Sequence, residues 1–108
     1  MINQKLLNPQ SIVVVGGSND IQKPGGKVLK NIIDGNFKGD LYVVNPKLTE
    51  VQGIKSYPTV EELPNVDLAI IAIAAKFTLD AVQTLVKQKQ TRAFIILSAG
   101  FSEESHEG

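Results

Sequence analysis

The stretch Ser11-Ile12-Val13-Val14-Val15-Gly16-Gly17-Ser18 decides the fold of this chain. Its central residues are apolar and β-branched, which is typical of a strand buried on both faces of a parallel sheet. After the glycine turn, apolar residues recur at helical spacing: Val28, Leu29, Ile32 and Ile33. The pattern therefore predicts a strand over 11–16, a glycine-rich loop and a helix that Gly35 ends in a left-handed conformation.

Three more segments are predicted to be strands of the same sheet, over residues 41–44, 67–73 and 93–97. A second helix lies between the last two, with an apolar stripe formed by Phe77, Ala81, Val82, Leu85 and Val86. Weaker patterns predict a short edge strand over 53–57 and one helical turn over 59–63, capped by Thr59. Strands that alternate with helices predict an α/β, Rossmann-like fold, an open parallel sheet with helices on both faces.

Length and composition exclude several classes of protein. The 108 residues have room for one domain, and the 11 Lys and Arg residues balance the 11 Asp and Glu residues, so no global field attracts nucleic acid or an anionic membrane. No cysteine is present, which excludes disulfides and cysteine-ligated metals. No apolar stretch approaches the ~18 residues of a membrane-spanning helix. We expect a cytoplasmic protein that binds neither nucleic acid nor membranes.

The fourth main strand has an unusual composition for its place in the chain. Residues 94–97, FIIL, are apolar on both faces, yet the sequence ends soon afterwards at Gly108. Edge strands are rarely so apolar, so we expect residues 1–108 to be one domain, truncated after this strand, at the start of a longer multidomain protein. The alternative is a complete small domain whose last strand is covered by a partner chain. Such a bare strand also predicts that the fragment self-associates or is marginally stable.

Ligands of open parallel sheets bind beyond the carboxyl ends of the strands. Four loops are predicted to meet there: Gly16-Gly17-Ser18-Asn19, Asn45-Pro46-Lys47, Ala74-Ala75-Lys76 and Ser98-Ala99-Gly100-Phe101. Their small residues let the backbone approach a ligand closely, and N–H groups that open a helix attract anions, so the composition suits a phosphate-bearing ligand. Tight packing of a strand against a helix also selects glycine, and that interpretation stays open for Gly16 and Gly17.

The details of these loops separate the possible ligands. The dinucleotide fingerprint G-x-G-x-x-G is absent, because Gly16 and Gly17 are adjacent and the next glycine is Gly25. No P-loop motif occurs either. After the second strand, Lys47 replaces the acidic residue of an NAD site and would attract a ribose phosphate, as in NADP or coenzyme A, unless it is simply solvated. Lys23 could reach a phosphate from the first loop, whereas Lys27 is expected on the exposed face of the helix.

Catalytic and metal-binding groups are scarce, and we predict neither kind of site. His106 is the only histidine and lies in an acidic tail with no element to position it. Ser18 and Ser98 have no general base nearby in the pattern, so neither is a predicted nucleophile. Asp67 opens its strand and is expected at the opposite end of the sheet from the ligand loops, as a turn or capping residue.

Taken together, four segments resemble the coenzyme A-binding domain of the NDP-forming (ADP-forming) acyl-CoA synthetases, a family related to the α subunit of succinyl-CoA synthetase. They are LLNPQSIVVVGGSND at 6–20, LYVVNPK at 41–47, GIKSYPTVEELPNVDLAIIAIAAK at 53–76 and FIILSAGFSEE at 94–104. The resemblance covers residues 6–108. The order of the four motifs is far more specific than the glycine turn alone.

The resemblance implies a function for the whole protein. In this family a carboxylic acid, coenzyme A and ATP or GTP with Mg²⁺ give an acyl-CoA, through an acyl phosphate and a phosphohistidine. The histidine and the nucleotide-grasp domain belong to downstream domains or a second subunit. The resemblance therefore implies that this fragment binds coenzyme A without catalysing a reaction.

The resemblance also assigns the coenzyme A-binding residues. They are Gly16, Gly17, Ser18, Asn19, Asn45, Pro46, Lys47, Ile73, Ala74, Ala75, Lys76, Ser98, Ala99 and Gly100. The composition of the first loop adds Lys23 to these candidates. Two positions depart from the family: Gly17 stands where alanine is common, and Ala74 stands where a proline often follows the third strand. Two other functions remain open, a coenzyme A- or nucleotide-sensing regulatory module, for example fused to an acetyltransferase, and an NADP-binding domain.

Overall fold

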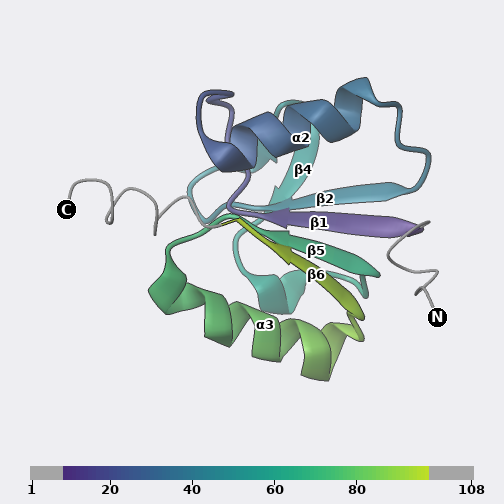
Figure 1. The fold of residues 1–108 in the computed structure, drawn as a ribbon, viewed down its shortest axis with the longest axis vertical. Coiled ribbons are helices and arrows are strands. Elements are labelled where there is room, and N and C mark those ends of the chain that lie inside the picture. The colour runs from purple at the N-terminus through teal and green to yellow at the C-terminus, as the bar shows by residue number, and fades with distance from the viewer. Residues whose placement is uncertain (1–8, 98–108) are drawn as a thin grey trace.

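A sheet in the order β3-β4-β2-β1-β5-β6 runs through the centre of the molecule (Figure 1). The computed structural model describes residues 9–97. The strands are β1 Ser11–Val15, β2 Asp40–Val44, β3 Glu50–Val51, β4 Ile54–Tyr57, β5 Leu68–Ile71 and β6 Ala93–Ile96. Helix α2, Pro24–Asp34, covers one face, and α3, Ala75–Lys89, covers the other together with the 3-10 turn η1, Val60–Glu62 (Figure 1).

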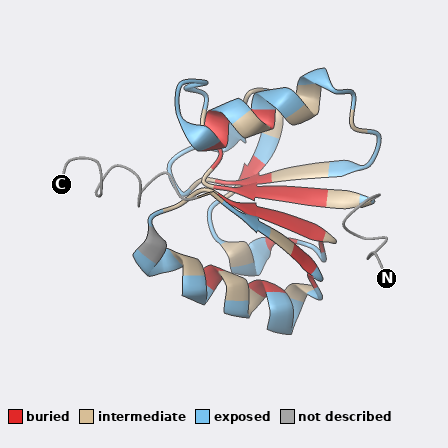
Figure 2. Cartoon of the chain, in the orientation of Figure 1, coloured by how far each residue is buried: buried red, intermediate tan, exposed pale blue. Residues whose placement is uncertain are grey.

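Strand β1 lies at the centre of the sheet, parallel to β2 on one side and to β5 on the other. Val13 and Val14 point to opposite faces and are both fully buried. Burying such a side chain stabilises the fold by about 1.5–3 kcal/mol. The prediction of a central strand buried on both faces, within a largely parallel α/β sheet, is confirmed (Figure 2).

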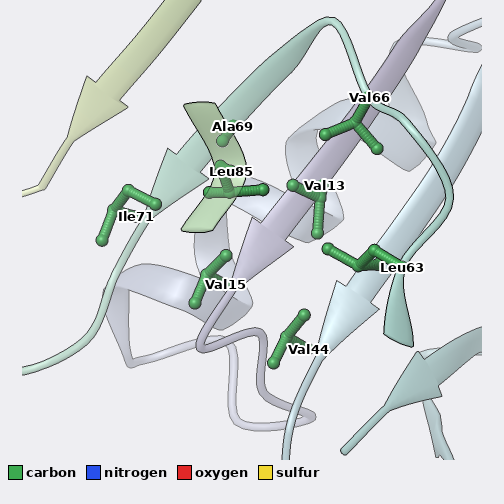
Figure 3. Close-up of a cluster of buried hydrophobic side chains, with 8 residues drawn as sticks. All are labelled: Val13, Val15, Val44, Leu63, Val66, Ala69, Ile71 and Leu85. Carbon is green, nitrogen blue, oxygen red and sulfur yellow. The ribbon is translucent and has the colours of Figure 1, made fainter. Parts of the chain in front are cut away.

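The two faces of the sheet carry separate apolar clusters. On the α3 face, Leu85 of α3 and Leu63 pack over Val13, Val15 and the neighbouring strands (Figure 3). On the α2 face, Leu29 of α2 packs with Val14, Val43 and Val51. Each helix therefore buries an apolar stripe on the sheet and leaves the carboxyl ends of the strands to be closed by loops.

One element escaped the sequence pattern, the hairpin formed by β3 and β4. It is the one antiparallel pair in the described sheet, and its two-residue turn, Gln52-Gly53, has φ angles of 51° and 84°. Positive φ at both positions is characteristic of a tight two-residue hairpin turn. The sequences usually found in such a turn are Asn-Gly and Asp-Gly. The predicted edge strand over 53–57 is thus β4, and it lies between β2 and β3 rather than at the edge.

Two predicted helix ends lie where expected, but the capping predicted for each is wrong. Gly35 follows α2 with φ −78°, and Asn36 adopts the left-handed conformation instead, with φ 63°. The N–H groups of Asn36 and Phe37 donate to the carbonyls of Ile33 and Ile32, the Schellman arrangement in which the left-handed residue follows the cap. Asparagine tolerates this conformation because its short side chain adds little crowding. Thr59 precedes η1, but its side chain makes no capping hydrogen bond.

The apolar stripe of α3 is narrower than predicted. Ala81 and Leu85 are buried and Val82 is half-buried, whereas Phe77 and Val86 are 54% and 51% exposed. None of the described helices is long and apolar enough to cross a membrane.

Strand β6 forms the edge of the sheet beside β5. Ile95 and Ile96 are 41% and 52% exposed, while Ala93, on the same strand, is buried (Figure 2). The predicted strand is therefore present and incompletely covered within residues 9–97. That a continuing chain covers it stays a prediction.

Candidate functional site

Three of the four predicted loops meet at the carboxyl ends of the central strands. The N–H of Gly16 donates to Val44 O at 2.9 Å, and the N–H of Ala72 donates to Val15 O at 2.8 Å. These bonds extend the hydrogen bonding between β1 and its neighbours β2 and β5 into the first residues of the loops. The fourth loop, with Ser98, Ala99 and Gly100, lies outside the described residues.

Gly16 is required by the close packing of two loops. Its φ is +95°, and a Cβ there would lie 2.5 Å from Ala72 O and 2.9 Å from Ile73 Cγ2. At Gly17, a Cβ would come within 2.7 Å of Val43 Cγ1. The close packing therefore accounts for glycine at both positions, and it does not conflict with a role of the turn in ligand binding.

The second pair of glycines brings α2 against the turn. A Cβ on Gly25 would lie 2.1 Å from Gly16 O, and one on Gly26 would lie 2.1 Å from Asp20 O. In dinucleotide-binding folds the third glycine of the fingerprint permits this close approach of helix and strand. Gly25 has that role here, after a longer loop. The spacing of the glycines in the sequence did not predict it. No side chain caps α2, which begins after the exposed Lys23.

Side chains inside the first loop hold its backbone. Ser18 Oγ accepts from Asp20 N–H at 2.9 Å, and Asp20 Oδ1 accepts from Gln22 N–H at 2.9 Å. Asn19 Oδ1 accepts from Gln52 N–H at 2.7 Å. The side-chain oxygens of Ser18 and Asn19 thus accept hydrogen bonds that hold the loop. The donors that the loop can offer an anion are its backbone N–H groups, the Ser18 hydroxyl and the Asn19 amide.

Asn45 joins the second loop to the glycine turn. Its Nδ2 donates to Gly17 O at 3.0 Å, and its Oδ1 accepts from Lys47 N–H at 2.9 Å. Pro46 and Lys47 are exposed. The structure therefore places Lys47 at the rim of the site with its ammonium group accessible, while Asn45 has a structural role.

The third loop leads directly into α3. The carbonyl of Ala74 accepts from Phe77 N–H at 2.9 Å and from Thr78 Oγ1 at 3.3 Å, and Ala75 is the first residue of the helix. The Lys76 ammonium lies 5.2 Å from the centre of the Phe77 ring, within range of a cation–π contact. Like Lys23 and Lys47, Lys76 is exposed.

A mainly apolar cavity of about 320 Å³ opens between these loops on the α3 side of the sheet. Its lining includes Gly16, Asn45, Pro46, Val60, Ile73 and Phe77. Sequence reasoning missed Val60 and Phe77 as parts of the site, because η1 was a weak prediction and Phe77 was assigned to the core stripe of α3. A polar rim of N–H groups and lysines therefore borders an apolar hollow.

Two residues away from the loops, Asp67 and His106, were considered in the sequence for capping, catalytic or metal-binding roles, and the structure describes the first of them. Residues 9–97 hold no group of three or more His, Cys, Asp or Glu side chains that could bind a metal ion. Asp67 lies at the opposite end of the sheet, where its Oδ2 accepts from Gln10 N–H at 2.9 Å, as its predicted place and capping role require. His106 lies outside the described residues.

Comparison with known proteins gives the same answer from sequence and from structure. Residues 10–107 match the family described as a CoA binding domain. The chain is 43% identical over 105 residues to a trans-feruloyl-CoA synthase from an unknown prokaryotic organism, covering 96% of this chain and 15% of the synthase. It is 43% identical over 104 residues to the alpha subunit of the ADP-forming acetate–CoA ligase II of Pyrococcus furiosus, covering 94% of this chain and 22% of that subunit.

A solved structure agrees with the sequence matches. The dinucleotide forming acetyl-coenzyme A synthetase 1 of Ca. Korarchaeum cryptofilum, in complex with phosphate and ADP, superimposes with a TM-score of 0.83 at 34% identity. The match covers 96% of this chain and 22% of that one. The chain thus spans about a fifth or less of the length of the relatives named here.

Proposed function

This chain belongs to the CoA binding domain family, and on that premise we propose that it is the coenzyme A-binding part of an ADP-forming acyl-CoA synthetase. The observation that carries the proposal is the pairing of a polar rim with an apolar cavity at the carboxyl ends of β1, β2 and β5. Coenzyme A needs both surfaces, because it carries anionic phosphates together with an adenine ring and a largely uncharged pantetheine arm.

The polar rim accounts for the phosphates. Backbone N–H groups at Gly17, Ser18 and Asn19 and at the start of α2 attract anions, and the helix dipole adds about 0.3–1 kcal/mol. Lys47, exposed beside the cavity, supplies a cation for the ribose phosphate, and Lys23 and Lys76 add positive charge at the first and third loops. We propose that Ser98, Ala99 and Gly100 complete the rim from the end of β6.

The apolar cavity accounts for an uncharged part of the coenzyme. Pro46, Val60 and Ile73 form walls that a flat ring or an alkyl chain can cover, and Phe77 stands at the mouth, 54% exposed. Covering such a surface gains about 25 cal/mol for each Å² of apolar area removed from water. In this arrangement the small side chain of Ala74 leaves room at the third loop for the coenzyme to pass.

The whole protein is proposed to be a cytoplasmic ligase. Its relatives include enzymes named as ADP-forming acetate–CoA ligases and as a trans-feruloyl-CoA synthase. We propose that the nucleoside triphosphate, ATP or GTP with Mg²⁺, binds to downstream domains or a second subunit, and that the acid is activated there. Residues 1–108 would then contribute the coenzyme A site and no catalytic group.

Calorimetric titration of the chain with coenzyme A, dephospho-coenzyme A and NADP tests the proposal. We expect coenzyme A to bind and dephospho-coenzyme A to bind more weakly. Lys47→Ala should reduce affinity for coenzyme A by roughly three- to tenfold, as expected for losing one exposed charge-assisted contact, and should leave dephospho-coenzyme A unaffected. Lys38→Ala, an exposed lysine after α2, is the matched control.

Three results would count against the proposal or against the role of Lys47 in it. Absence of heat with millimolar coenzyme A would remove the coenzyme site altogether. Tight binding of NADP with no response to coenzyme A would assign the same rim to a dinucleotide instead. An equal loss for coenzyme A and its dephospho form in Lys47→Ala would place that lysine away from the ribose phosphate.

A further inference from the structure

Gln52, in the turn between β3 and β4, makes three hydrogen bonds to the loop that joins β1 to α2 and to the start of α2. Its Nε2 donates to Ser18 O at 2.8 Å and to Gly26 O at 3.0 Å, and its N–H donates to Asn19 Oδ1 at 2.7 Å. Ser18 and Asn19 lie in the loop, and Gly26 lies in the first turn of α2. One residue of the hairpin therefore ties the loop and the start of the helix to the sheet edge.

The conformation of the β3–β4 turn does not explain why residue 52 is a glutamine. Both turn residues have positive φ, 51° at Gln52 and 84° at Gly53, and glycine, asparagine or aspartate is preferred at such positions. A non-glycine residue in the left-handed region is retained where its surroundings hold it. At Gln52 the surroundings are the two carbonyls that its half-buried amide reaches.

Two side-chain amides fix two successive peptide groups of the glycine turn. Asn45 Nδ2 holds the carbonyl of Gly17, and Gln52 Nε2 holds the carbonyl of Ser18. In a planar trans peptide the N–H points opposite to the C=O, so the N–H groups of Ser18 and Asn19 point away from these two amides. Among residues 9–97, neither N–H group has a hydrogen-bond acceptor. Successive N–H groups of this kind form anion-binding concavities.

We propose that Gln52 is a positioning residue for coenzyme A, which acts by aiming the N–H groups of the glycine turn at a phosphate of the ligand. The inference rests on the proposed function. According to this inference, the β3–β4 hairpin influences the affinity for coenzyme A through the glycine turn. It does so although the hairpin contributes no residue to the lining of the apolar cavity. Gln52 itself need not touch the ligand.

The variant Gln52→Gly separates this role from the stability of the turn. Glycine suits a φ of 51°, so the hairpin should persist while both side-chain hydrogen bonds disappear. We expect about tenfold weaker binding of coenzyme A by calorimetry, the effect of one to two lost neutral hydrogen bonds. Gln88→Ala, on the exposed face of α3, deletes a glutamine elsewhere and should bind like the unaltered chain.

A second readout identifies the route of the effect. In ¹⁵N NMR spectra, saturating coenzyme A should shift the amide signals of Ser18 and Asn19 strongly in the unaltered chain and weakly in Gln52→Gly. Urea unfolding checks that each variant is folded during the titration. If Gln52→Gly does not fold, Gln52→Asn replaces it, since asparagine also accepts the left-handed conformation but is one methylene too short to reach both carbonyls.

The outcomes distinguish this inference from the proposed function. If the unaltered chain binds no coenzyme A, both fail. If the unaltered chain binds and the folded Gln52 variant binds equally well, the positioning role alone is wrong. It is also wrong if affinity falls while the Ser18 and Asn19 signals still shift as in the unaltered chain, because the loss then arises elsewhere.

Discussion

At the scale of one residue, Gly16 shows that close packing and ligand binding can both require a glycine at the same position. Its positive φ turns the chain sharply out of β1, and the missing side chain lets Ala72 and Ile73 close against the turn. The N–H groups of Ser18 and Asn19, farther along the turn, have no acceptor among residues 9–97. Sequence reasoning left packing and binding as competing explanations for this glycine, and the structure shows that the packing demand is real without removing the other.

We expect Gly16→Ala to destabilise the chain more than Gly53→Ala. Both glycines have positive φ, so both substitutions introduce backbone strain of roughly 1–2 kcal/mol. A Cβ at Gly53 meets nothing within 4 Å, whereas one at Gly16 lies 2.5 Å from a backbone oxygen. The additional clash should cost roughly 1–3 kcal/mol more, measured as the free energy of unfolding in urea. Equal losses in the two variants would mean that the turn can open without penalty.

At the scale of elements, the hairpin and the capping of the helices were the parts that sequence patterns could not predict. Apolar runs identified β1, β2, β5 and β6, and helical spacing of apolar residues identified both helices, because burial on a sheet imposes these patterns directly. The hairpin turn Gln52-Gly53 carries no standard turn signal, and β3 is too short to show a period. Helix α2 ends before Gly35 as predicted, but Asn36, rather than Gly35, takes the left-handed conformation.

Strand β6 is the element that should govern association. Ile95 and Ile96 are exposed on an unpaired edge of the described sheet, and such edges pair with other chains. We expect the 108-residue chain to self-associate in sedimentation equilibrium and Ile96→Lys to shift it towards the monomer, since a charged edge residue opposes strand pairing. Gln83→Lys, on the exposed face of α3, is the control for the added charge. A stable, strictly monomeric unaltered chain would refute the prediction.

At the scale of the whole molecule, the sequence predicted the fold and the meeting of the loops, but not the hydrogen bonds that connect them. The rule that ligands bind beyond the carboxyl ends of parallel strands brought the loops after β1, β2 and β5 together, and Gly16, Asn45 and Ile73 line one cavity in the structure. The rule could not show that the amide of Asn45 holds the glycine turn, since that depends on which way the amide points. Nor could it find Gln52, whose contacts cross from a hairpin that the pattern did not predict.

The central claim is that coenzyme A binds across the glycine turn and the apolar cavity at the carboxyl ends of the central strands. Mapping of amide shifts by ¹⁵N NMR during a titration of the unaltered chain with coenzyme A tests it most directly. We expect the shifts to concentrate in residues 16–26, 45–47 and 73–77, with Gln10 and Asp67 at the opposite end of the sheet unchanged. Shifts centred on Gln10 and Asp67, or no shifts at saturating coenzyme A, would contradict the claim.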